Sequence, residues 1–152
     1  MKIIFICLGN ICRSPMAEAV FRDMVEKAGL SDYIQIDSAA TSSWEQGNPV
    51  HQGTVRQLAK VGISTHGMYS RQLNDNDLNA DYLIGMDEQN IQNIRRFVAG
   101  RSDAQIVKLL HFADSERDIA DPWYTDDFDA TYRDVVAGCS GLLELLQSQF
   151  TS

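Results

Sequence analysis

The first fifteen residues constrain the fold more than any other stretch of the chain. Residues 3–7 are all apolar, which is typical of a central strand in a parallel sheet covered on both faces. A short loop follows, and Ser14-Pro15 predicts a helix start, because serine caps helices and proline suits the first helical position. A strand that enters a helix through a compact loop predicts an anion site, since backbone N–H groups converge there and the helix dipole adds positive potential.

This loop also contains residue types that bind phosphate and react with it. Cys7 stands at its start, where the helix N-terminus stabilises a thiolate. Arg13 stands at its end, and its planar guanidinium matches the oxygens of a phosphate. Five intervening residues can curl so that their N–H groups point inward. We therefore predict a catalytic phosphate site with Cys7 as nucleophile; a structural cysteine before an ordinary helix is the alternative.

Further residues of the loop are expected to shape it. Gly9 is expected to take the positive φ that such a turn needs. Asn10 tolerates left-handed geometry, and its amide could brace the loop. The Ser14 hydroxyl could donate to the sulfur of Cys7 and hold it as a thiolate. The predicted phosphate-binding residues besides Arg13 are Leu8, Gly9, Asn10, Ile11, Cys12 and Ser14.

Apolar runs and helical stripes divide the rest of the chain into alternating elements. Further strands are predicted over residues 33–38, 82–86 and 105–110. Helices are predicted over residues 15–27, 55–61, 88–97 and 127–148, with loops over 39–53, 63–79 and 111–128. This order predicts a single α/β domain over residues 1–152, an open four-stranded, mainly parallel sheet flanked by helices on both faces, with the phosphate loop after the first strand.

Composition excludes several classes of function. The 152 residues carry a net charge of −8, which argues against nucleic-acid partners and against anionic membrane surfaces. No apolar run approaches the ~20 residues of a membrane span. Three cysteines do not make a disulfide framework, so a reducing, cytoplasmic location is expected. No set of residues has the spacing of metal ligands, and the expected chemistry needs no metal or cofactor.

Two later loops contain the other expected site residues. Both follow predicted strands, so both can reach the carboxyl edge of the sheet, where ligands bind. One contains Trp44, and the other contains Asp121-Pro-Trp-Tyr124. Asp121 is the expected proton donor to a leaving group. Its rivals are Asp118, Asp126 and Asp127, and Asp121-Pro122 could instead be only a turn.

These motifs together resemble the low-molecular-weight protein tyrosine phosphatase family, over essentially the whole chain. The resemblance lies in Cys7-Leu-Gly-Asn-Ile-Cys-Arg-Ser-Pro15, Asp37-Ser-Ala-Ala-Thr41, Gly47-Asn-Pro49, Ser70-Arg-Gln72, Met86-Asp-Glu88 and Asp121-Pro-Trp-Tyr124. It implies that Cys7 is the nucleophile of a phosphocysteine pathway, that Arg13 binds phosphate and stabilises the transition state, and that Asp121 is the general acid and then base. It implies phosphotyrosine proteins as substrates, a bacterial tyrosine kinase among them, and phosphate or other oxyanions as ligands of the site.

The resemblance also implies roles for aromatic and sulfur side chains. Trp44 and Trp123 would flank the substrate ring, with Tyr124 as a third aromatic wall; the alternative is that the tryptophans are packing anchors. Cys7 and Cys12 would form a reversible disulfide as a redox switch, which protects the nucleophile from irreversible oxidation; a space-filling role is the alternative for Cys12. Cys139 is expected in the core.

Histidines fit the family pattern less well. Relatives often have a histidine just before the Ser70-Arg-Gln72 segment that braces the loop asparagine, and Met68 stands at that position here. Either His66 reaches in by a shifted loop, or the brace is absent. His51 and His111 are expected to be ordinary surface residues.

Three alternative functions remain. A protein arginine phosphatase would have a small threonine in place of Ile11 and no large aromatic residue at Trp123. An arsenate reductase would need a pair of late cysteines, whereas only Cys139 is present. A catalytically silent phospho-binding module would lack Cys7, Arg13 or Asp121.

Overall fold

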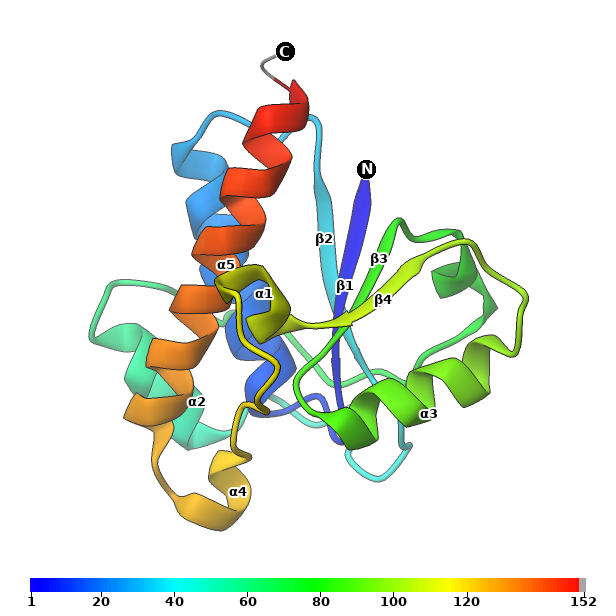
Figure 1. Cartoon of the computed structure of the whole chain (residues 1–152). Coiled ribbons are helices and arrows are strands. Elements are labelled where there is room, and N and C mark those ends of the chain that lie inside the picture. The colour runs from blue at the N-terminus through cyan, green and yellow to red at the C-terminus, as the bar shows by residue number, and fades with distance from the viewer. Residues whose placement is uncertain (151–152) are drawn as a thin grey trace.

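A four-stranded parallel sheet forms the centre of the protein, which is described here over residues 1–150 of a computed structural model (Figure 1). The strands are β1 (Lys2–Cys7), β2 (Gln35–Ala40), β3 (Tyr82–Gly85) and β4 (Gln105–Lys108). Their spatial order is β2-β1-β3-β4, and every neighbouring pair is parallel. The predicted parallel α/β sheet is therefore confirmed.

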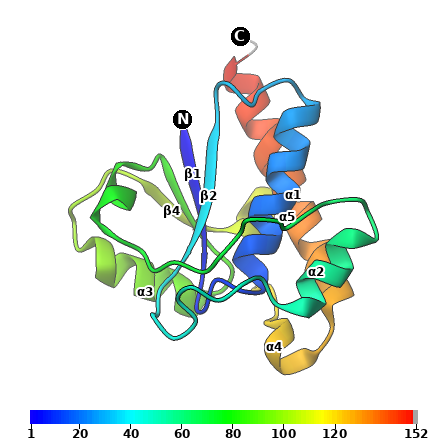
Figure 2. The same cartoon turned by 180° about the vertical axis from the view of Figure 1, so that it is seen from behind.

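Helices cover both faces of this sheet, as predicted. The helices α1 (Arg13–Lys27), α2 (Gln52–Ala59) and α5 (Phe128–Phe150) lie on one side, and α3 (Glu88–Val98) lies on the other (Figures 1 and 2). Part of α5 packs on α1, and α3 packs on β3 and β4. Among residues 1–150, no helix combines the length and the apolar character needed to cross a membrane.

The protein has a hydrophobic core on each face of the sheet, and the apolar residues of β1 contribute to both. Ile3 and Phe5 face α1 and α5, whereas Ile4 and Ile6 face α3, and all four side chains are fully buried. Successive side chains of a strand point to opposite faces of the sheet, so a strand covered on both sides must be apolar at every position. Phe5 also meets Phe21 of α1 edge to face, with ring centroids 5.7 Å apart.

Several element boundaries differ from prediction. β2 starts at Gln35 rather than Tyr33 and reaches Ala40. β4 ends at Lys108, because Leu109 and Leu110 turn into a 3-10 helix, η2 (Leu109–Ala113), that packs against α5. Those leucines are buried against a helix rather than within the sheet. A Cβ at Gly138 of α5 would overlap Leu109, so this close approach depends on a small residue there.

The predicted loops contain short helices. The segment 63–79 ends in a 3-10 helix, η1 (Asp75–Asn79), and the segment 111–128 contains α4 (Pro122–Thr125). Helix α1 begins at Arg13 rather than Pro15, and Cys12 is its N-cap. The predicted cap by Ser14 is therefore wrong, because this hydroxyl bonds elsewhere.

The loops after β1 and β2 meet at the carboxyl edge of the sheet. The amide of Thr41 donates to the carbonyl of Cys7, and the amide of Ser42 donates to that of Leu8. Figure 1 shows α4 at this end of the molecule, with the N-terminus and the last described turn of α5 near the opposite end. The edge that sequence reasoning selected is therefore the edge where the candidate residues gather.

Candidate functional site

The loop after β1 wraps around the sulfur of Cys7. The backbone N–H of Asn10 donates to Cys7 Sγ across 3.3 Å, and Ser14 Oγ lies 3.1 Å from the same sulfur. Asn10 adopts the left-handed conformation, with φ of 57°. The expectation that Gly9 would do so is wrong: Gly9 is not among the positive-φ residues, and its lack of a side chain serves its close approach to Glu45.

The Asn10 side chain fixes this loop to the neighbouring segments, as predicted. Its Nδ2 group donates to Ser14 Oγ across 2.7 Å and to Ser38 Oγ on β2 across 2.9 Å. Its Oδ1 accepts the backbone N–H of Arg71 across 3.1 Å. Since a backbone N–H only donates, this last bond settles which end of the amide is oxygen. Every hydrogen-bonding group of this buried amide is used.

A carboxylate sets the direction of the whole chain of hydrogen bonds. Glu18 on α1 is buried, and its Oε1 accepts the hydroxyl of Ser38 across 2.5 Å. An ionised carboxylate only accepts, so the single hydrogen of Ser38 points at Glu18, and Ser38 must accept from Asn10. Ser14 likewise accepts from Asn10, which leaves the one hydrogen of Ser14 to point at Cys7. The predicted Ser14–Cys7 contact therefore delivers a donor to the sulfur, which stabilises a thiolate.

No histidine takes part in this chain. His66 is exposed, so the alternative in which it reaches into the loop is wrong. Ser38 and Glu18 support the asparagine instead. Sequence reasoning missed both residues, although a signal was available. Glu18 is an acidic residue within the otherwise apolar stretch from Met16 to Phe21, and buried acids require partners.

The guanidinium of Arg13 is buried and held by two acidic side chains. Its Nη1 donates to Asp87 Oδ2 across 2.7 Å and to the carbonyl of Ile119 across 2.9 Å. Its Nη2 lies 3.5 Å from Asp121 Oδ2. Burial by itself lowers the pKa of Arg13, but the charge of Cys7 and the bonds to Asp87 outweigh it, so the pKa is raised and the charge persists. Sequence reasoning assigned no role in the site to Asp87.

Of the four aspartates considered as proton donor, Asp121 is the one that lines the cavity beside Cys7 and Arg13. It is the N-cap of α4, where its Oδ1 accepts the N–H of Trp123 across 3.0 Å. Asp118 is exposed and accepts the N–H of Glu88, and Asp127 accepts the N–H of Ala130 at the start of α5. The reading of Asp121-Pro122 as only a turn is therefore incomplete, because this turn aims a carboxylate at the buried arginine.

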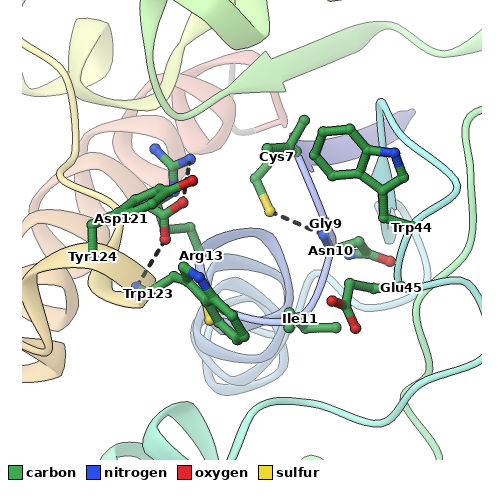
Figure 3. Close-up of a pocket in the computed structure, with 12 residues that line it drawn as sticks. Cys7, Gly9, Asn10, Ile11, Arg13, Trp44, Glu45, Asp121, Trp123 and Tyr124 are labelled. Carbon is green, nitrogen blue, oxygen red and sulfur yellow. Dashed lines mark hydrogen bonds and ion pairs between the residues drawn. The ribbon is translucent and has the colours of Figure 1, made fainter.

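These groups line a cavity of about 220 Å³ at the carboxyl edge of the sheet. Figure 3 shows Trp44 on one side of Cys7, with Trp123 and Tyr124 on the other side, beside Asp121. The lining residues are Cys7, Leu8, Gly9, Asn10, Ile11, Cys12, Arg13, Trp44, Glu45, Asp121, Trp123 and Tyr124. Of the residues predicted for the site, only Ser14 is outside this lining, since it lies behind the sulfur.

The two tryptophans are walls rather than packing anchors. Trp44 is 77 % exposed and Trp123 is 57 % exposed, whereas an anchor beneath a long loop would be buried. Tyr124 is 79 % exposed as well. Exposed aromatic side chains around the mouth of a cavity offer flat surfaces to an aromatic ligand.

His51 is not the ordinary surface residue that was expected. Its ring stacks on Phe128 at 5.2 Å between centroids and meets Trp123 edge to face at 5.6 Å. Its Nδ1 accepts the N–H of Gly53 and so caps α2, and its own backbone N–H donates to the carbonyl of Ile11. His51 therefore links the phosphate loop to one aromatic wall.

The three cysteines are free thiols in different surroundings. Burial, followed by the charges of Cys7 and Asp121, raises the pKa of Cys12 to about 12. Burial alone raises the pKa of Cys139, which lies in the core as predicted. Within residues 1–150, no three His, Cys, Asp or Glu side chains gather as a metal site would require.

Comparison with known proteins shows the family to which the chain belongs. The model of the family "Low molecular weight phosphotyrosine protein phosphatase" matches residues 2–152. Low molecular weight protein-tyrosine-phosphatase YfkJ of Bacillus subtilis is 41% identical, over 98% of this chain and 97% of its own. The chain therefore belongs to the low molecular weight phosphotyrosine protein phosphatase family, and the predicted resemblance is confirmed.

Solved structures show the same relationship. The crystal structure of YfkJ from Bacillus subtilis has a TM-score of 0.93 and 43% identity, covering 98% of this chain and 96% of that one. The low molecular weight protein tyrosine phosphatase of Streptococcus pyogenes has a TM-score of 0.85 and 41% identity, covering 95% and 92%. A Drosophila arginine phosphatase shares the fold at a TM-score of 0.88 with 28% identity, covering 100% and 99%.

We predict that Ser38→Ala weakens both the fold and the phosphate loop. The substitution removes the hydroxyl that bonds to Glu18 Oε1 and one of the two acceptors of Asn10 Nδ2, which costs about 1–3 kcal/mol of unfolding free energy. Asn10 then keeps only its bonds to Ser14 and Arg71, so the loop is held less firmly and affinity for inorganic phosphate falls. Urea denaturation and calorimetric phosphate titration measure the two effects. Ser43→Ala, at an exposed serine, is the control and should change neither; unchanged stability in Ser38→Ala would contradict the assigned chain.

Proposed function

We propose that this protein is a protein-tyrosine phosphatase that hydrolyses phosphotyrosine through a phosphocysteine intermediate. The observation that carries the proposal is the convergence of Cys7, Arg13 and Asp121 on one cavity with aromatic walls. The relatives named as tyrosine phosphatases, which match almost the whole chain, support it.

The first step transfers the phosphoryl group to sulfur. The loop amides and Arg13 hold the three equatorial oxygens, and the Cys7 thiolate attacks phosphorus in line. The bond from phosphorus to the tyrosine oxygen breaks as the sulfur–phosphorus bond forms. The tyrosine phenol has a pKa of ~10, so its oxygen leaves more readily when Asp121 donates a proton to it.

The second step releases inorganic phosphate. Asp121, now a carboxylate, takes a proton from a water molecule, and the water oxygen attacks the phosphorus of phosphocysteine. The sulfur–phosphorus bond breaks, and Cys7 leaves as a thiolate that the Ser14 hydroxyl and the backbone N–H of Asn10 stabilise. Asp121 ends protonated and Cys7 ends ionised, so the cycle balances with water as its only co-reactant.

The mouth of the cavity favours an aryl ester over a guanidinium phosphate. Trp44, Trp123 and Tyr124 are exposed flat surfaces around a buried phosphate loop, and Ile11 fills space on the cavity lining. An arginine phosphatase of Drosophila is 28% identical, whereas the tyrosine phosphatase YfkJ of Bacillus subtilis and that of Streptococcus pyogenes are each 41% identical. An arsenate reductase relay finds no support, because Cys139 is buried in the core.

The proposed substrates, catalytic domain and cellular location follow from the same chemistry. Phosphotyrosine proteins are the proposed partners, a bacterial tyrosine kinase being one such substrate, and phosphate is the product ligand. The proposed catalytic unit is the single domain of residues 1–152. A thiolate nucleophile works in a reducing compartment, so the proposed location is the cytoplasm.

We predict that Asp121→Asn lowers turnover of phenyl phosphate by about 10²–10⁴-fold, because the variant cannot protonate the leaving group. The loss should be smaller for a nitrophenyl ester, whose leaving group needs no proton. Cys7→Ser should abolish turnover of both esters. Steady-state kinetics on the two esters and on phosphoarginine, without added metal, measure these effects.

The matched control is Asp126→Asn, which changes an exposed acid at the end of α4 and should keep wild-type turnover. Residual turnover in Cys7→Ser would overturn the phosphocysteine pathway. A wild-type preference for phosphoarginine would favour the arginine phosphatase alternative, and phosphopeptide binding without any turnover would favour a silent module.

We also propose that Cys12 protects Cys7 as the partner in a reversible disulfide. Hydrogen peroxide would convert the Cys7 thiolate to a sulfenic acid. The Cys12 thiol would then attack that sulfur and release water as the disulfide forms. Oxidation neutralises Cys7, which removes one of the causes of the raised Cys12 pKa and so eases loss of the Cys12 proton.

We predict that the wild type regains activity after peroxide treatment once a dithiol reductant is added. Cys12→Ser should regain only a minor fraction, because its Cys7 proceeds to irreversible sulfinic acid. Cys139→Ser, at a core cysteine, is the control and should recover like the wild type. Equal recovery in Cys12→Ser would leave Cys12 with a space-filling role.

A further inference from the structure

A second groove adjoins the active-site cavity on the far side of Trp44. Its volume is about 440 Å³. The loops after β1 and β2 form one bank through Leu8 and Thr41, and α3 forms the other through Arg96 and Phe97. Leu8 and Trp44 line both the groove and the cavity, so the two hollows lie next to each other. Figure 2 shows the turn after β2 lying beside α3.

Of the residues that the structure describes, Arg96 is the only one with a charged side chain that lines this groove. Its Nη1 donates to Asn93 Oδ1 across 3.2 Å. Within residues 1–150, no carboxylate lies within ion-pair distance of Arg96, although acids outnumber basic residues by 21 to 13 in the chain. By contrast, Arg71 bonds to both Asp37 and Asp77. Among the described residues, the groove therefore holds a cation without an ion-pair partner.

On the other side of Trp44, the active-site cavity is lined by the buried Arg13 and by one acid, Glu45. Glu45 Oε2 accepts from Asn48 Nδ2 across 2.6 Å rather than from a cation. An acidic ligand group is attracted on the Arg96 side of Trp44 and repelled on the Glu45 side. The net charge of −8 also disfavours peptides that are acidic throughout. These charges therefore suit a ligand with one acidic side chain at a fixed position, where it can reach Arg96.

We propose that the groove binds the peptide segment next to the phosphotyrosine, and that Arg96 pairs there with one acidic side chain of the substrate. This inference rests on the proposed function, in which the phosphotyrosine ring lies beside Trp44, so that the flanking chain can reach the groove on the other side of that residue. Leu8 and Phe97 offer it apolar contact, and Gln72 offers an amide. The groove thus selects among phosphotyrosine sites by one neighbouring residue.

The test uses phosphotyrosine peptides that differ by one Glu or Gln at each position within four residues of the phosphotyrosine. The wild type should favour Glu over Gln at one position, by about threefold in kcat/KM, the range of an exposed ion pair. Arg96→Gln should remove that preference. Arg95→Gln should keep it, because Arg95 has the same charge one residue earlier on α3 but does not line the groove.

Each outcome decides the proposal. A wild type with no preferred position, an Arg96→Gln variant that keeps the preference, or an equal loss in Arg95→Gln would overturn it. Turnover of phenyl phosphate reports the proposed function separately and should be the same in all three proteins. If no protein hydrolyses that ester, the proposed function fails, and fluorescence anisotropy with the same peptides and Cys7→Ser protein decides whether the groove binds acid through Arg96.

Discussion

The site depends on a chain of hydrogen bonds that can run in only one direction. It begins at the buried carboxylate of Glu18, passes through Ser38 and Asn10, and ends with the Ser14 hydroxyl at Cys7. Because the carboxylate can only accept, each hydroxyl has its hydrogen committed. The sulfur therefore meets a fixed donor, and fixed donors stabilise charge without reorganisation during the reaction.

The same chain joins segments that are distant in sequence. Glu18 and Ser14 belong to α1, Ser38 belongs to β2, and Asn10 belongs to the loop after β1. The side-chain oxygen of Asn10 also accepts the backbone N–H of Arg71. A bonded, buried amide of this kind is costly to disturb. It holds the loop in the left-handed turn at Asn10, so that neighbouring N–H groups can face a bound phosphate.

Asn10 fixes the loop after β1 to neighbouring segments, and Arg13 likewise fixes the segment that contains Ile119 and Asp121. Its guanidinium reaches Asp87 at the start of α3, the carbonyl of Ile119 and the carboxylate of Asp121. His51 makes a second link, since it bonds to Ile11 and touches Trp123. The proposed proton donor, Asp121, and the cavity-lining Trp123 are thus attached to the loop after β1.

Much of this was predictable, because simple rules govern it. The apolar run of β1 indicated a doubly covered strand, and the rule that parallel strands end at one edge brought Cys7, Trp44 and Asp121 together correctly. The sequence alone could not show that Leu109 and Leu110 leave the sheet for η2, since buried strands and buried helices are equally apolar.

The features of the site that sequence reasoning did not show have a common physical cause. Asn10 rather than Gly9 takes the positive φ, because its amide has partners that reward that conformation. Ser38 and His51 gain their roles from groups that are close only after folding. Propensity reports what a residue does locally, whereas hydrogen-bond partners that lie far apart in sequence decide these positions.

The most direct test of the account is to trap the covalent intermediate. Asp121→Asn protein mixed with a nitrophenyl phosphate and quenched within one turnover should yield a Cys7 peptide heavier by one phosphoryl group in mass spectrometry. The phosphoryl group should vanish as phosphate is released. Release of nitrophenol with no phosphoryl group on Cys7, or with the group on another residue, would contradict the account.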